Sequence, residues 1–348
     1  MTTFAIGVDL GGTNLRIAAV ESTGKILEKI TTGTEVARGR DRVIDEMCTA
    51  VRTLALKHRG LGELAGIGVG VPGIIDMGTG MLRESPNLPG WQDYPVRQEI
   101  ERRLATAVFL ENDANAAALG EKWLGAAAAV DDMCMLTLGT GVGGGLVLHG
   151  RVWRGMMGMA AEIGHINVEP QGRPCNCGSR GCLEQYASAT AVKQMALEAI
   201  AGGKAPELAQ AMNADAEFSS KAVHHMALEG DEPAQEIFRR VGRALGIALA
   251  DLINIFNLPM YVIGGGVASA WSAFAPAMFE TVKSYSYIYR VTAPQQITKD
   301  GAKEPASALG KNTVITQALL GSDAGLMGAA RLPMVARQET WEQASRQS

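Results

Sequence analysis

The chain has 348 residues, and its 32 basic and 36 acidic side chains give a net charge of −4. This balance, without a basic stripe or an acidic tail, argues against binding to nucleic acid or to a membrane surface. The length exceeds one ordinary core and predicts two domains with a cleft between them. No run of about 18 apolar residues occurs, and the N-terminus lacks the features of a signal peptide, so we expect a soluble, cytoplasmic protein.

The N-terminal segment predicts three short strands that follow one another as a meander. Apolar runs occupy residues 4–8, 17–20 and 26–31, and turns that contain glycine separate them. The first turn, residues 9–14, reads Asp-Leu-Gly-Gly-Thr-Asn. Such a turn at a strand end exposes backbone N–H groups, which bind phosphate oxygens. The turn therefore indicates a phosphate site, although a plain tight hairpin explains it equally well when it is taken alone.

The same arrangement returns later in the chain. An apolar run at residues 136–138 leads into the turn 139–141, and further strands are expected at residues 142–148 and 150–152. Two copies of one supersecondary unit indicate a duplicated architecture. We expect the two glycine turns to face each other across the cleft and to hold one polyphosphate together.

A buried strand between the two glycine turns ends in polar side chains. Its apolar run stops at Leu110, and Glu111, Asn112 and Asp113 follow directly before helix-forming residues. A carboxylate at a strand end, beside a helix N-terminus and facing a cleft, is where a catalytic base is expected. Asp113 also has a purely structural interpretation, because aspartate is a common helix N-cap.

One histidine and three closely spaced cysteines form a metal-ligand pattern. Its members are His165, Cys175, Cys177 and Cys182. One imidazole and three thiolates make a closed tetrahedral set, which suits structural zinc and leaves no position for a metal-bound water. The alternatives are a surface loop with free thiols and a disulfide. Cysteines spaced for metal, with Cys48 and Cys134 left over, agree with a reducing compartment.

Two carboxylates flank this cysteine loop. Glu162 lies three residues before His165, and Glu184 lies two residues after Cys182. A metal that fixes the loop also fixes these two acceptors, and rigid acceptors suit a polyhydroxylated ligand. The loop therefore predicts a site for a sugar-like molecule.

The C-terminal half predicts a long amphipathic helix, roughly residues 234–256, followed by a strand that ends in Gly264-Gly-Gly266. Three glycines at a strand end allow the backbone to approach a flat ring or a sugar. Neither G-x-G-x-x-G in a βαβ unit nor G-x4-G-K-[ST] is present, which disfavours a Rossmann site and a P-loop. Segments 202–230 and 292–312 are expected to be helical decoration and an extra loop.

Taken in order, these motifs resemble those of the ROK family of sugar kinases and related repressors, and within it the chain is most similar to the bacterial glucokinases. The matching segments are 9–16, 111–121, 138–145, 162–165, the cysteine loop with Glu184, and 264–267. They span nearly the whole chain.

The resemblance implies an α/β fold of the two-domain, actin-like ATPase type, with each domain built on a ribonuclease-H-like unit and a structural zinc loop at 165–184. We expect residues 1–118, completed by a C-terminal helix at 323–337, to form the first domain. Residues 119–322 would form the larger second domain. ATP and sugar would meet in the cleft.

The resemblance also implies roles for individual residues. Asp113 would remove the proton from the acceptor hydroxyl, and the other sugar-binding residues would be Gly73, Asn87, Asn112, Glu162, His165 and Glu184. The nucleotide-binding residues would be Asp9, Gly11, Gly12, Thr13, Asn14, Gly139, Thr140, Gly141 and Gly265. Mg²⁺ would accompany ATP and contact Asp9, through water, and His165 would serve both zinc and sugar.

The implied reaction is ATP-dependent phosphorylation of a hexose, glucose to glucose 6-phosphate, in glycolysis, by a cytoplasmic homodimer. N-acetylmannosamine, N-acetylglucosamine, fructose and allose are alternative substrates, because the residues that hold common hydroxyls serve all of them. A noncatalytic sugar-binding protein is a further alternative. A repressor is disfavoured because only eight residues precede Asp9, too few for a helix-turn-helix module.

Overall fold

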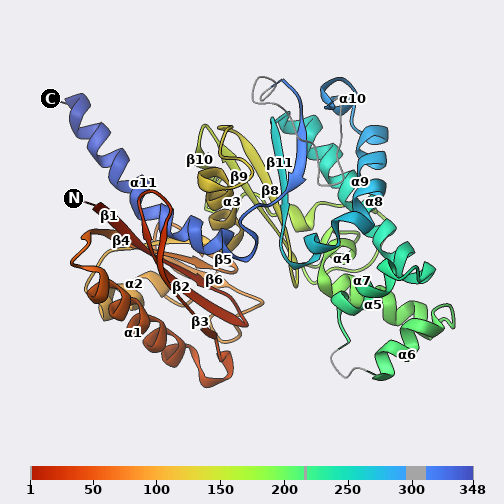
Figure 1. The fold of residues 1–348 in the computed structure, drawn as a ribbon, viewed down its shortest axis with the longest axis horizontal. Coiled ribbons are helices and arrows are strands. Elements are labelled where there is room, and N and C mark those ends of the chain that lie inside the picture. The colour runs from red at the N-terminus through yellow and green to blue at the C-terminus, as the bar shows by residue number, and fades with distance from the viewer. Residues whose placement is uncertain (1, 215–217, 295–310, 348) are drawn as a thin grey trace. The chain divides into compact units, whose positions relative to one another are not determined.

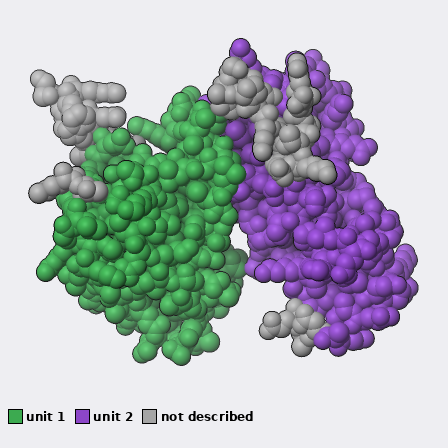
Figure 2. Space-filling model, viewed as in Figure 1, with its two compact units in different colours: residues 1–131, 145–160, 319–348 green, residues 132–144, 161–318 purple. Residues whose placement is uncertain are grey.

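The computed structural model describes residues 2–214, 218–294 and 311–347. The chain divides into two compact units, which are coloured separately in Figure 2. Unit 1 consists of Met1–Asp131, Gly145–Ala160 and Leu319–Ser348, and unit 2 of Asp132–Gly144 and Ala161–Ala318. Most of the extra loop expected at 292–312 lies outside the described residues.

The first five-stranded sheet belongs to unit 1. Its order is β3 (Ile26–Gly33), β2 (Asn14–Glu21), β1 (Thr2–Leu10), β4 (Gly62–Val71) and β7 (Val108–Asn112). β1 to β3 form the expected antiparallel meander, and β4 and β7 run parallel to β1. The carboxyl ends of β1, β4 and β7 therefore meet at one edge of the sheet, where Asp9, Gly73 and Asp113 occur.

Helices cover both faces of this sheet (Figure 1). On one face, Phe4, Ile6 and Val8 of β1 form a core with α1 (Arg40–His58) and α2 (Val96–Leu104). On the other face, α11 (Ala324–Gln347) packs so closely that a Cβ on Gly68 of β4 would collide with the Ala329 carbonyl oxygen.

Helix α11 also packs on α3 (Asp113–Leu124), and Gly328 of α11 allows the two helices to approach closely. A Cβ on Gly328 would collide with the backbone of Ala116. Helix α11 ends at Gln347, beyond residue 337, where the sequence analysis expected the C-terminal helix to end. A short hairpin of β5 (Ile74–Asp76) and β6 (Met81–Glu84) lies between β4 and α2 in the chain.

The second five-stranded sheet repeats the order of the first. It runs β10 (Arg151–Val152), β9 (Val142–Leu148), β8 (Met133–Leu138), β11 (Met260–Gly264) and β12 (Val314–Gln317). β11 is parallel to both β8 and β12, and β10 is antiparallel to β9. If the five strands of each sheet are numbered by their order in the sequence, both sheets are arranged as third, second, first, fourth and fifth strand from one edge to the other. The duplicated α/β architecture predicted from the two glycine turns is confirmed.

The helices of unit 2 gather around one long element. α8 (Glu232–Phe256) buries one apolar face, as expected for an amphipathic helix, whereas Phe256 at its C-terminal end is 40% exposed. It packs on α9 (Trp271–Tyr285), where a Cβ on Gly242 would collide with the Phe274 carbonyl oxygen. The shorter helices are α4 (Glu184–Ala187), α5 (Ala189–Ala201), α6 (Pro206–Ala214), α7 (Ser220–Leu228) and α10 (Tyr289–Thr292). Among the described residues, no helix is both long and apolar enough to cross a bilayer.

Candidate active site and metal centre

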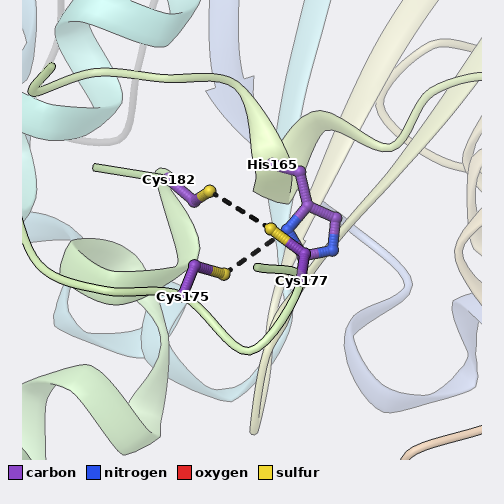
Figure 3. A group of neighbouring side chains, drawn as sticks. All are labelled: His165, Cys175, Cys177 and Cys182. Carbon is purple, nitrogen blue, oxygen red and sulfur yellow. Dashed lines mark hydrogen bonds between the residues drawn. The ribbon is translucent and has the colours of Figure 1, made fainter. Parts of the chain in front are cut away.

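The four predicted metal ligands come together in unit 2. Figure 3 shows the side chains of His165, Cys175, Cys177 and Cys182 pointing toward one another, and all four ligand atoms lie within 4.8 Å of one another. The Cys175 Sγ to His165 Nδ1 distance is 3.7 Å, and the Cys177 Sγ to Cys182 Sγ distance is 3.6 Å. Donors bound to one tetrahedral zinc ion lie about 3.5–3.8 Å apart. The geometry therefore fits a Cys₃His metal site.

The backbone of the loop explains how these ligands converge. Gly178 and Gly181 adopt φ values of 88° and 70°, a left-handed conformation that favours glycine. A side chain on Gly181 would also collide with the Glu169 carbonyl oxygen. These two glycines therefore allow the loop to bend around the four ligands. Gln185 Nε2 lies 3.6 Å from Cys175 Sγ and donates to it, which supports a thiolate ligand at that position.

The sugar-binding residues predicted in unit 2 lie beside this centre. His165 presents Nδ1 to the cysteines, so Nε2 remains for a second partner. Partial loss of hydration raises the pKa of the Glu162 carboxyl above its ordinary value. The nearby His165 lowers the pKa, and the charge of Glu184 raises it further. Two carboxylates and one imidazole nitrogen are thus within electrostatic reach of one another.

The second glycine turn, residues 139–141, is held by the segment that follows the cysteine loop. Val142 N donates to Glu184 Oε2 at 2.9 Å, and Thr190 Oγ1 donates to the Thr140 carbonyl oxygen at 2.8 Å. Ala189 N donates to the Gly139 carbonyl oxygen, also at 2.8 Å. The sequence analysis did not identify these contacts.

Gly265 lies against the strand that leads into this turn. Its φ is 88°, and a Cβ there would lie 2.6 Å from Leu138 N. The structure therefore brings the third glycine-rich segment to the start of the second turn.

The first glycine turn lies in unit 1 beside the loop that carries Asn87. Gly11 N donates to the Asn14 carbonyl oxygen at 2.9 Å, and Thr34 N donates to the Thr13 carbonyl oxygen at 2.9 Å. A Cβ on Gly12 would lie only 2.6 Å from the Asn87 carbonyl oxygen. The structure thus joins a predicted phosphate turn and a predicted sugar-binding loop within one unit.

Asp9 precedes this turn at the end of β1. Burial raises the pKa of its carboxyl, while its hydrogen bond and ion pair with Arg16, at 3.0 Å, act in the opposite direction. Gly325 lies next to the carboxyl, and a Cβ on this glycine would touch Asp9 Oδ1 at 3.4 Å. The carboxylate is therefore partly enclosed and already has one cationic partner.

The N-terminus of α3 is capped by Asn112 and not by Asp113. Asn112 is extended, and its Oδ1 accepts from Ala114 N at 2.9 Å and from Asn115 N at 3.2 Å. Its Nδ2 donates to the Gly73 carbonyl oxygen at 3.2 Å. The alternative interpretation of Asp113 as the N-cap is therefore wrong, because the preceding residue already fills that position.

Arg154 is a residue that the sequence analysis missed. Its Nε and Nη2 both lie 2.7 Å from Glu111 Oε2, and the Glu111 side chain is fully buried. Glu111 Oε1 accepts from Asn112 N and from Asn115 Nδ2. The pair thus supports the backbone directly before Asp113. The two partners are 43 positions apart, so no local pattern pointed to them.

The chain is similar to known proteins over nearly its whole length. The model of the ROK family matches residues 5–334. A glucokinase of Thermotoga maritima is 38% identical over 94% of this chain and 96% of its own length. The crystal structure of a ROK family glucokinase from Streptomyces griseus in complex with glucose and AMPPNP is 32% identical, with a TM-score of 0.75 over 94% of this chain and 98% of that one. A xylose repressor of Caldicellulosiruptor bescii is 30% identical over 81% of this chain and 71% of the repressor.

Proposed function

Because this chain belongs to the ROK family, we propose that it is an ATP-dependent sugar kinase that converts glucose to glucose 6-phosphate. The observation that carries the proposal is the edge of the first sheet. Asp9 lies at the end of β1, and Gly73 and Asp113 follow the neighbouring parallel strands β4 and β7, so a predicted phosphate turn and a carboxylate occur at the same edge. The similarity to glucokinases supports the choice of glucose.

In the proposed reaction, Asp113 accepts the proton of the sugar hydroxyl as the hydroxyl oxygen attacks the terminal phosphorus of ATP. The bond between that phosphorus and the bridging oxygen breaks, and ADP leaves. Phosphoryl transfer mainly requires alignment and charge neutralisation, so one carboxylate together with backbone donors and Mg²⁺ is sufficient. Asp9 would contact that Mg²⁺ through water.

The remaining sugar hydroxyls would be held by Asn87, Asn112, Glu162, His165 and Glu184. Asn112 uses Oδ1 for its cap and one N–H for Gly73, which leaves one N–H for a hydroxyl. His165 would bind zinc through Nδ1 and a hydroxyl through Nε2. The zinc ion would have a structural role, since four protein donors leave no position for a substrate.

The phosphates of ATP would lie on the two glycine turns, on Gly11 to Asn14 and on Gly139 to Gly141. The two turns occupy corresponding places in the duplicated sheets. Gly11 N and Gly139 N bond within their own turns, so the N–H groups of the residues after them would bind the phosphates. Gly265, packed on Leu138, would lie beside the nucleoside.

ADP release measured across a panel of sugars tests the proposal. The panel contains glucose, fructose, allose, N-acetylglucosamine and N-acetylmannosamine, and the expected result is the highest kcat/KM with glucose. A higher kcat/KM with another sugar would support the assignment as a kinase but would identify that sugar, and not glucose, as the substrate. Sugar binding without ADP release from any member of the panel would overturn the kinase and favour a noncatalytic sugar-binding protein.

A further inference from the structure

We propose that the segment Glu184–Thr190, here called the brace, holds the second glycine turn in its phosphate-binding conformation, and that Glu184 couples the affinities for sugar and nucleotide. The inference rests on the proposed function, in which Glu184 contacts the sugar and the turn contacts ATP. It adds a positioning role for Thr190 and a thermodynamic link between the two ligands.

The first step is the set of hydrogen bonds between the brace and the turn. Glu184 Oε2 accepts from Val142 N, Ala189 N donates to the Gly139 carbonyl oxygen, and Thr190 Oγ1 donates to the Thr140 carbonyl oxygen. All three bonds lie within unit 2 and measure 2.8–2.9 Å.

The second step is the flexibility of an unbraced turn. The turn, residues 139–141, consists of two glycines and one threonine. Glycine has the largest backbone freedom of any residue, so such a segment loses much conformational entropy when its N–H groups converge on a phosphate. Hydrogen bonds on the carbonyl oxygens of Gly139 and Thr140 remove part of this freedom before ATP arrives. The brace therefore preorganises the turn, which improves affinity.

The third step concerns the two oxygens of Glu184. Oε2 is held by Val142 N and lies so close to Gly141 that a Cβ on this glycine would collide with it. A sugar hydroxyl that donates to Oε1 would fix the same carboxylate from its other side. Binding of either the sugar or ATP would then fix the Glu184 carboxylate and the turn together. The entropy lost on ordering them would therefore not be lost again when the other ligand binds. Thermodynamic linkage requires that each ligand raise the affinity for the other by the same factor.

A purely structural role for these contacts would give a different pattern. Loss of the Thr190 bond would then lower stability and leave both affinities unchanged. Thr190 is exposed and lies in the first turn of α5, so its replacement should leave the chain folded and the affinities can be measured directly.

Calorimetric titration of the full chain with AMPPNP, with and without saturating glucose, tests the inference. In the unmodified chain glucose should tighten AMPPNP binding by about fivefold to tenfold. Thr190→Val, which removes the hydroxyl and keeps the shape, should weaken AMPPNP binding by about fivefold and leave glucose binding alone unchanged. Thr190→Ser, which keeps the hydroxyl, should restore the affinity for AMPPNP.

The Glu184→Ala variant tests the coupling between glucose and AMPPNP binding. Glucose binding should weaken, and saturating glucose should no longer tighten AMPPNP binding. Unchanged AMPPNP affinity in Thr190→Val would overturn the brace, and coupling that persists in Glu184→Ala would overturn the link. Both results leave the proposed kinase intact. An unmodified chain that binds neither glucose nor AMPPNP would instead overturn the proposed function, and this inference with it.

Discussion

Replacement of Asp113 by asparagine separates catalysis from folding, because the structure assigns the helix cap to its neighbour. Asp113 Oδ1 accepts from Ala114 N at 2.9 Å, and an asparagine oxygen can accept the same bond. Asn112 continues to cap α3. The free energy of unfolding should therefore change by less than about 0.5 kcal/mol, as for a substitution that preserves local contacts.

The effect on turnover should be much larger. A positioned general base contributes roughly two to four orders of magnitude, which corresponds to about 3–5 kcal/mol of activation free energy. The amide of asparagine cannot accept the proton, although it can still hydrogen-bond to the hydroxyl. We expect kcat for ADP release to fall by this factor while the calorimetric dissociation constant for glucose stays within about threefold.

The matched control is Asn112→Ala. It removes the cap and the bond to Gly73, so it should lower the free energy of unfolding by about 1–2 kcal/mol and raise KM for the sugar. Asp113→Asn should thus lose turnover and keep its stability, whereas Asn112→Ala should lose stability. If Asp113→Asn kept near-normal kcat, Asp113 would not be the base. If it lost as much stability as Asn112→Ala, the assignment of the helix cap to Asn112 alone would be wrong.

Three further substitutions test the metal centre and the backbone around it. Cys177→Ser should release the metal, and elemental analysis should show zinc in the unmodified chain and little in the variant. Arg154→Ala should lower the free energy of unfolding in urea by about 2–3 kcal/mol, because it leaves the buried Glu111 carboxylate without its cationic partner. Ala161→Gly should raise the same free energy by roughly 0.5–1 kcal/mol, since Ala161 has a φ of 67°, a conformation that strains residues with a Cβ.

Each substitution has a control in the same chain. Cys134→Ala should retain zinc, because Cys134 lies outside the cluster, and a metal content equal to that of Cys177→Ser would contradict the ligand assignment. Arg154→Lys should recover part of the lost stability by keeping the charge. Ala160→Gly should lower stability by about 0.5–1 kcal/mol, because Ala160 does not have a positive φ. Equal effects at residues 160 and 161 would refute the argument from strain.

Much of the fold was predictable because it is encoded in local patterns. Apolar runs bounded by glycine turns marked β1 to β3 and β8 to β10, and the helical period marked α8. The repeat of one turn motif was sufficient to predict a duplicated architecture, and the structure shows it as two sheets with the same strand order. The metal centre was predictable for a similar reason, since the spacing of donors along a loop limits which ion they can surround.

The roles of neighbouring polar residues were not predictable in the same way. Asn112 and Asp113 are adjacent, and both are good N-cap residues. Which of them caps α3 depends on where the strand β7 ends and the first helical turn begins, a boundary fixed by packing. Once the structure assigned the cap to Asn112, Asp113 required another explanation.

By itself, the sequence determined the duplicated architecture, the glycine turns and the ligands of the metal centre, because each depends on residues close together in the chain. Only the tertiary structure decided how these parts support one another. Glu111 meets Arg154 across 43 positions, Val142 meets Glu184 across 42, and Thr140 meets Thr190 across 50. Such pairs form when separate elements pack together, and local periodicity carries no record of which elements will meet.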